Sequence, residues 1–68
     1  MVYSDIKLLI GSRKLPISAT NEKGENVIVS EGEAGGVHYY ETQTFQSNDW
    51  VRTNTYYADG TIDESYDK

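Results

Sequence analysis

The sequence predicts an all-β domain, a small antiparallel meander of five to six strands. Three observations predict it: glycine-bearing turns recur along the chain, apolar and polar residues alternate between them, and tyrosine and threonine are frequent in the intervening stretches. We expect residues 1–68 to form a single domain. An open sheet with one apolar face needs cover, so we expect the sheet to be curled into a barrel or sandwich, or completed by dimerisation.

The first stretch, Val2–Ile10, alternates well enough to predict a strand with every second residue on one side. A short helix starting at Ser4, with Asp5 in its first turn, is the alternative. The strand is favoured because Gly11–Ser12 resembles a two-residue hairpin loop. Such a loop would place residues 13–19 opposite the first strand.

The next turn is a three-residue loop, Glu22–Gly24, with glycine at the position that favours a left-handed backbone. The pairs that follow are Asn21–Glu25, Ala19–Val27 and Ile17–Val29. One apolar face then collects Ile6, Leu8, Leu15, Ile17, Val27 and Val29. The glycine-rich run Glu31–Gly36 interrupts the alternation, and we expect it to be a mobile connection between two three-stranded halves.

The second half, Val37–Tyr66, predicts three strands joined by the loops Gln46–Asp49 and Ala58–Gly60. The second loop predicts the pairs Tyr57–Thr61, Tyr56–Ile62, Thr55–Asp63, Asn54–Glu64 and Arg52–Tyr66. The first loop predicts the pairs Phe45–Trp50, Gln43–Arg52, Glu41–Asn54, Tyr39–Tyr56 and His38–Tyr57.

Because side chains alternate across a strand, this register sorts the second half into two faces. The predicted core face holds Val37, Tyr39, Phe45, Trp50, Tyr56, Ile62 and Tyr66. The predicted outer face holds His38, Tyr40, Thr42, Thr44, Thr53, Thr55, Tyr57, Asp63 and Ser65. A slip of one residue in the pairing would exchange the two faces.

The composition argues against most catalytic chemistry. The chain has 68 residues, no cysteine and one histidine, so it has no disulfide, no thiolate and no multi-histidine zinc site of its own. Glu41 and Glu64 are the only candidate acid–base pair, and nothing supplies a nucleophile or a substrate cradle. We therefore expect a protein that is not an enzyme and that uses no cofactor and no metal.

Size and charge indicate the kind of partner. A core this small supplies only about 3–5 kcal/mol, so a homo-oligomer is a reasonable expectation. The net charge of −5 opposes duplex nucleic-acid binding, where lysine and arginine neutralise phosphate, and favours a protein partner with a basic surface. No apolar run approaches the length of a membrane span, and we expect a cytoplasmic protein without a membrane partner.

The predicted outer face carries the candidate binding residues. Exposed tyrosines offer a large contact area at small entropic cost, although tyrosine and threonine also simply suit strands. The candidate partner-binding residues are Tyr40, Tyr57, His38, Asp59, Asp63, Glu64 and Asp67. The sequence therefore predicts a small acidic protein-binding module. By analogy of composition, it would be an inhibitor of the type that phages and mobile elements encode, which occupies a nucleic-acid-binding surface by imitating phosphate.

Two alternatives belong to other classes. Tyr39, Tyr40, Tyr56, Tyr57 and Trp50 would form a platform for stacking the bases of single-stranded nucleic acid, with Lys7, Arg13, Lys14 and Arg52 facing phosphate. The charge balance argues against this alternative. The other is a self-assembling structural subunit whose strand edges pair with another copy.

Overall fold

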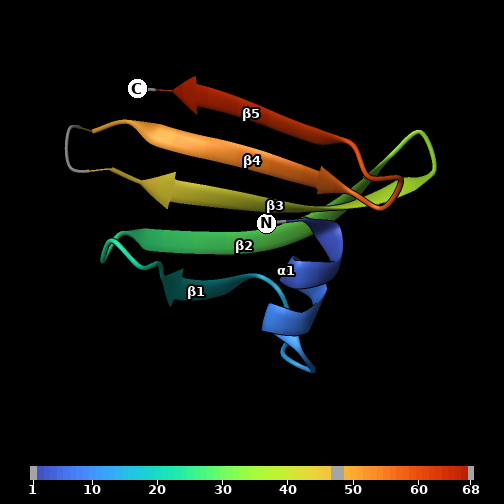
Figure 1. The fold of residues 1–68 in the computed structure, drawn as a ribbon, viewed down its shortest axis with the longest axis horizontal. Helices are drawn as coiled ribbons and strands as arrows, with labels where there is room; N and C mark the ends of the chain where they lie inside the picture. The colour runs from blue at the N-terminus through green and yellow to red at the C-terminus, as the bar shows by residue number, and fades with distance from the viewer. Residues whose placement is uncertain (1, 47–48, 68) are drawn as a thin grey trace.

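The protein folds as one open five-stranded antiparallel sheet with a single helix on one face (Figure 1). The computed structural model describes residues 2–46 and 49–67. The elements are α1 (Tyr3–Ile10), β1 (Ile17–Thr20), β2 (Asn26–Ala34), β3 (Val37–Phe45), β4 (Val51–Tyr57) and β5 (Ile62–Asp67). The strands lie in the order β1-β2-β3-β4-β5. The predicted all-β meander is confirmed with five strands, and the sheet does not close into a barrel.

The predicted first strand is wrong, because this segment forms helix α1. Ile6 and Ile10 lie one helical turn apart and are both buried, whereas Leu8, which the strand would place beside them, is 82% exposed. At the start of the helix, the Val2 N–H donates to the Asp5 carboxylate over 2.9 Å. The helix ends at Gly11, so the predicted Gly11–Ser12 hairpin does not form.

The predicted mobile connection over Glu31–Gly36 is also wrong. Strand β2 continues to Ala34, which pairs with Val37, and only Gly35 and Gly36 lie between the two strands. Both glycines have positive φ, 58° and 80°, as a two-residue type I′ hairpin turn requires. The two predicted halves are therefore one continuous sheet.

Three of the hairpins close in the same way. The N–H of the residue before each three-residue loop donates to the carbonyl of the residue after it, in the pairs Asn21–Glu25, Gln46–Trp50 and Tyr57–Thr61. The predicted registers β1–β2 and β4–β5 are confirmed. The predicted β3–β4 register is wrong by one residue: Tyr39 pairs with Tyr57 and Phe45 with Val51, since the loop is closed by Gln46 rather than Phe45. Ser47 and Asn48 of the predicted four-residue loop lie outside the described residues.

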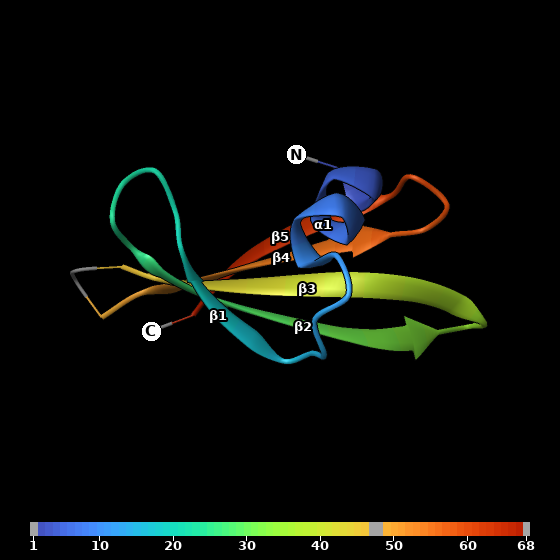
Figure 2. The same cartoon turned by 90° about the horizontal axis from the view of Figure 1, so that it is seen from below.

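This shift exchanges the faces of β3 relative to β4. The face under α1, hereafter the helix face, comprises Ile17, Ala19, Val27, Val29, Glu31, Glu33, His38, Tyr40, Thr42, Thr44, Arg52, Asn54, Tyr56, Ile62, Glu64 and Tyr66. The opposite face, hereafter the open face, comprises Ser18, Thr20, Asn26, Ile28, Ser30, Gly32, Ala34, Val37, Tyr39, Glu41, Gln43, Phe45, Val51, Thr53, Thr55, Tyr57, Asp63, Ser65 and Asp67. Figure 2 shows α1 and the β1–β2 hairpin rising on the same side of the sheet.

The core lies between α1 and the helix face. Its buried apolar members are Ile6, Ile10, Val29, Tyr40 and Tyr56, with Tyr3, Leu15, Ile17 and Val27 packed against them. Val37, Tyr39 and Phe45, which the sequence predicted in the core, lie on the open face, and none of them is buried. Within residues 2–46 and 49–67, no helix is long and apolar enough to cross a membrane.

Candidate protein-binding face

The candidate residues of the sequence analysis do not share one face. Helix-face positions hold His38, Tyr40 and Glu64, open-face positions hold Tyr57, Asp63 and Asp67, and Asp59 lies in the β4–β5 turn. Tyr40 is only 8% exposed. It is therefore part of the core, and the prediction that Tyr40 is an outer-face residue is wrong.

The open face places a different tyrosine beside Tyr57. Tyr39 is its cross-strand partner, and the two rings meet edge-on with their centroids 5.5 Å apart. Such a pair adds a favourable contact beyond the area that it covers. Gly32 lies opposite Tyr39 on β2, and a methyl group there would lie 2.5 Å from the Tyr39 hydroxyl oxygen. The missing side chain of Gly32 thus leaves space for the Tyr39 ring to lie flat over β2.

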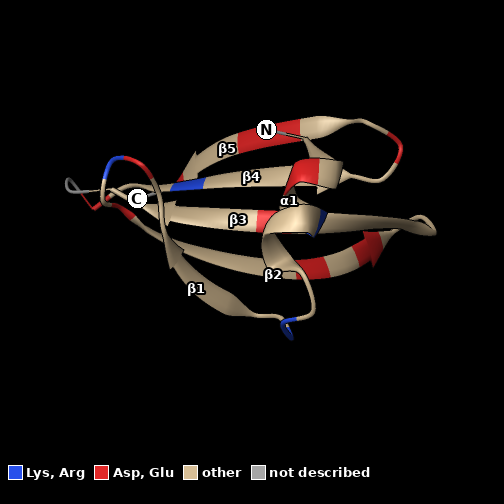
Figure 3. Ribbon diagram, turned by 60° about the horizontal axis from the view of Figure 1, so that its bottom comes forward, with Lys and Arg blue, Asp and Glu red and all other residues tan. Residues whose placement is uncertain are grey.

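Carboxylates occupy the adjoining rows of the open face. Glu41 and Asp63 flank Thr55 from opposite sides, which separates their backbones by about 10 Å, or two strand spacings. Asp67 lies farther along β5, opposite Val51. No lysine or arginine holds any open-face position among the described residues of the five strands. In Figure 3 the basic positions colour α1, the loop after it, the β1–β2 turn and one place on β4.

The far end of the open face includes apolar side chains. Phe45 is 44% exposed and pairs with Val51 on β4. Ile28 lies on the same face of β2, one row away from Phe45. The face therefore carries an aromatic pair at one end, Glu41 and Asp63 in the middle, and Phe45 and Val51 beside Asp67 at the other end. Aromatic side chains are enriched in protein interfaces, and polar groups typically form the rim around them.

The β4–β5 turn presents Asp59 next to this surface. The Thr61 N–H donates to the Asp59 carboxylate over 2.9 Å. That backbone hydrogen bond lowers the pKa of Asp59 below its usual value of 3.8. The side chain therefore holds its negative charge while it stabilises the turn.

His38 has a structural role on the helix face. Its Nε2 lies 2.7 Å from the Glu31 carboxylate, and its Nδ1 lies 2.7 Å from the Tyr3 hydroxyl. Since a carboxylate only accepts, Nε2 carries the proton, and in the neutral ring Nδ1 accepts from Tyr3. The centroid of the Tyr40 ring lies 4.8 Å from the ring centroids of Tyr3 and His38. Burial is the largest cause that raises the pKa of Tyr40 above 10.0, and the nearby Tyr3 and Glu31 raise it further. This network joins α1 to the sheet.

Glu64 is likewise held on the helix face rather than presented beside Asp63. It accepts hydrogen bonds from the Tyr66 hydroxyl over 2.7 Å and from the Asn54 amide over 3.0 Å. Both hydrogen bonds lower the pKa of Glu64 below 4.5, and the bond from Tyr66 has the larger effect. The same bond to Glu64 raises the pKa of Tyr66 above 10.0. Glu64 therefore stays ionised within a local polar cluster.

Sequence reasoning missed Tyr39 and Glu41 as open-face residues, and one signal in the sequence points to them. Asp49 has a positive φ of 66°, the conformation that Gly24 and Gly60 adopt in the other two loops. Aspartate is among the few non-glycine residues that tolerate this region. A three-residue loop ending at Asp49 gives the observed register and places Tyr39 beside Tyr57.

Among the described residues, no three histidine, aspartate or glutamate side chains gather in a way that would hold a metal ion. Searches with the whole chain found no matching protein-family model, no matching curated protein and no matching solved structure.

Proposed function

We propose that the protein is a small non-enzymatic protein-binding module whose open face docks onto a basic surface of a larger partner. The observation that carries the proposal is the open face itself, where Glu41, Asp63 and Asp67 accompany the Tyr39–Tyr57 pair and no basic side chain of the described strands offsets them. A basic nucleic-acid-binding surface is the complementary partner, so the protein would act as an inhibitor that competes with phosphate.

The energetics of association support different roles for the tyrosines and the carboxylates. Exposed charges steer association and set specificity, whereas desolvated aromatic groups supply most of the affinity. In the proposed complex, Tyr39 and Tyr57 anchor the contact, and Glu41 with Asp63 selects basic partners. Steering by exposed charge is screened over about 8–10 Å at physiological ionic strength, so binding weakens as salt rises.

Single-stranded nucleic acid remains the alternative occupant of the tyrosine pair. Base stacking would use Tyr39 and Tyr57, but phosphate would then face Glu41 and Asp63, with no lysine or arginine at the described positions of this face. Self-assembly through strand edges is the third arrangement. Both serve as outcomes of the experiment below.

The test uses the tagged protein to capture proteins from the heparin-binding fraction of a bacterial lysate at low and high salt. We expect capture at low salt, release at high salt, and competition by an oligonucleotide. The double variant Glu41→Gln/Asp63→Asn should lose most of the capture. Its control is Glu22→Gln/Glu33→Gln, which removes the same charge from the β1–β2 turn and the helix face.

Two further variants separate the alternatives. Tyr39→Ala and Tyr57→Ala should each weaken capture while keeping the β-sheet circular dichroism spectrum. Equal loss in both double variants would point to net charge alone and would contradict docking through the open face. Direct retention on single-stranded oligonucleotides would favour the stacking alternative, and a stable homo-oligomer without captured protein would favour self-assembly.

A further inference from the structure

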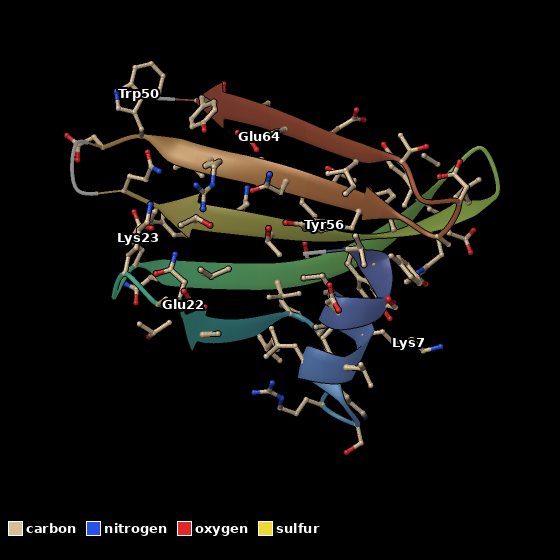
Figure 4. All side chains as sticks on the ribbon, viewed as in Figure 1. Lys7, Glu22, Lys23, Trp50, Tyr56 and Glu64 are labelled. Atoms are coloured by element: carbon tan, nitrogen blue, oxygen red, sulfur yellow. The ribbon has the colours of Figure 1, made fainter. Side chains whose placement is uncertain are left out.

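A groove lies on the helix face, on the opposite side of the sheet from the proposed docking surface. It runs between α1 and the upturned β1–β2 hairpin and has a volume of about 410 Å³. Figure 2 shows the two walls rising on one side of the sheet, and Figure 4 shows Glu22 and Lys23 at the turn of the hairpin. Cavities of about 300–1,000 Å³ accommodate small organic molecules.

The groove combines apolar walls with a polar floor. Ile6 and Leu9 of α1 face Val27 across it, and Leu9 is 47% exposed although it is a large apolar side chain. The floor carries Thr42, Thr44, Asn54 and Arg52, and the first three are buried. Hydrogen-bonding groups on the floor beneath aliphatic walls suit a ligand that has one polar end and one apolar body.

Arg52 is the exceptional residue of the floor. Its Nε is buried and has no hydrogen-bond acceptor among the described residues. The nearest acidic side chain in its register, Glu64, lies one pair away and is occupied by Asn54 and Tyr66. Arg52 also interacts electrostatically with Glu64 and with Tyr66, but its Nε remains without an acceptor among the described residues. A buried donor without a partner costs free energy, so an oxyanion that supplies the acceptor stabilises the chain.

We propose that this groove binds a small aliphatic carboxylate, whose head group pairs with the Arg52 guanidinium and whose chain lies between Leu9 and Val27. A carboxylate matches the guanidinium fork through two parallel hydrogen bonds, one of them from Nε. Because Nε is screened in the free protein, binding includes a rotation of the Arg52 side chain that turns Nε toward the groove.

The local charge selects a monoanion over a phosphate. Arg52 and Lys23 line the groove together with Glu22, and Glu64 also interacts with Arg52, so these side chains hold no surplus positive charge with which to balance a dianion. A dianion would need further cations. The apolar walls in turn favour a hydrocarbon body over a sugar or a nucleotide. This inference stands on the opposite face of the sheet and does not depend on the proposed function.

The experiment titrates the ¹⁵N-labelled protein with octanoate and follows amide chemical shifts by NMR. We expect saturable shifts confined to α1, the β1–β2 hairpin and the middle of β3 and β4. The neutral comparator 1-octanol should bind at least tenfold more weakly, since it cannot form the charged pair. Equal affinity for octanol and octanoate would show that the groove binds only through apolar contacts, and this would overturn the proposal.

The matched variants are Arg52→Gln and Lys7→Gln, which each remove one positive charge. Lys7 is exposed on α1 and points away from the sheet (Figure 4). Arg52→Gln should weaken octanoate binding by about tenfold or more, as expected for a charge-assisted bidentate pair, and Lys7→Gln should leave it unchanged. Undiminished binding by Arg52→Gln, or shifts confined to the open face, would overturn the proposal.

A second variant covers the case in which Arg52→Gln fails to fold. Ala19 lines the groove on β1, and Ala19→Phe fills the space without changing any charge. This variant should lose octanoate binding and keep the β-sheet spectrum. Unchanged affinity in the folded Ala19→Phe protein would place the ligand elsewhere and refute the assignment.

Discussion

The Tyr3 hydroxyl lies 2.7 Å from Nδ1 of His38, thirty-five residues later in the chain. This hydrogen bond joins the first turn of α1 to β3, and the Glu31 carboxylate holds the other ring nitrogen. The helix is therefore attached to the sheet by a polar network at one end and by the apolar contacts of Ile6 and Ile10 along its length.

Replacing Tyr3 with phenylalanine tests the polar attachment. Tyr3→Phe removes the hydroxyl and leaves His38 Nδ1 without its partner, so we expect the free energy of unfolding to fall by about 0.5–1.5 kcal/mol. Urea denaturation followed by circular dichroism measures the change. Tyr57→Phe, which removes a hydroxyl from the open face, is the control. A loss no larger than that of the control would mean that the Tyr3–His38 bond contributes nothing.

The apolar attachment is tested by two neighbours on α1 with opposite exposure. Ile6 is 0% exposed and Leu8 is 82% exposed. Ile6→Ala should cost about 2–5 kcal/mol, a large part of the stability of so small a domain. Leu8→Ala should stay within about 0.5 kcal/mol. Thermal melts of both variants compare them directly, and similar melting temperatures would show that α1 does not cover the core.

Tyr40 makes stability depend on alkaline pH. Burial, together with Tyr3 and Glu31, raises its pKa in the folded state above the ordinary value of 10.0. Its contribution to stability is therefore complete below about pH 10 and is lost as the pH rises through the raised pKa of the folded state. We expect Tyr40→Phe to show a shallower loss of melting temperature above pH 10 than the wild type. Parallel curves for the two proteins would rule out this linkage, and Tyr57→Phe controls for general effects of alkali.

Glu64 makes the stability of the fold depend on pH in the acidic range. The Tyr66 and Asn54 hydrogen bonds lower its pKa below 4.5, so its contribution is complete above that value and is lost as the pH falls through the lower folded-state pKa. Tyr66→Phe removes the larger cause and should move the pKa of Glu64 upward. A ¹³C NMR titration of the Glu64 carboxyl resolves this shift. The same pKa in the wild type and in Tyr66→Phe would show that the hydroxyl does not stabilise the carboxylate.

Gly32→Ala tests whether the space over Gly32 sets the position of the Tyr39 side chain on the open face. The added methyl group would lie 2.5 Å from the Tyr39 hydroxyl oxygen and 2.7 Å from Cζ, so the ring must move. The tip of the side chain can swing outward, and we expect a stability change within about 1 kcal/mol. The Tyr39–Tyr57 nuclear Overhauser contacts should weaken, and capture of a basic partner should fall. Ser30→Ala, on the same face of β2, should change neither.

The sequence predicts the strand register at the two three-residue loops that end in a glycine. Gly24 and Gly60 close loops whose register is observed as predicted. The β3–β4 register escaped prediction because Asp49 takes the position that glycine holds in the other two loops. The resulting shift of one residue in the register places Tyr39 and Glu41 on the face where Tyr40 was predicted, because successive side chains of a strand point to opposite faces.

The helix was missed for a different reason. Over eight residues, strand alternation and helical spacing both place Ile6 and Ile10 on one side, so the pattern alone does not separate them. Packing decides, since only the helix buries both isoleucines against Tyr40 and leaves Leu8 in water. The sequence predicted the residue types of the candidate site, acidic residues beside tyrosines. It did not predict which of these residues share one face, because that depends on the register.

Strand β5 forms one border of the sheet, and all six of its residues are exposed. Its carboxylates alternate between the two surfaces, with Glu64 on one and Asp63 and Asp67 on the other. Adding an identical strand there would stack like charges on both sides, so fibril growth from this border is opposed while the acids are ionised. Acidification removes that repulsion, and gelation or amyloid formation should begin at this border once the carboxyl groups become neutral.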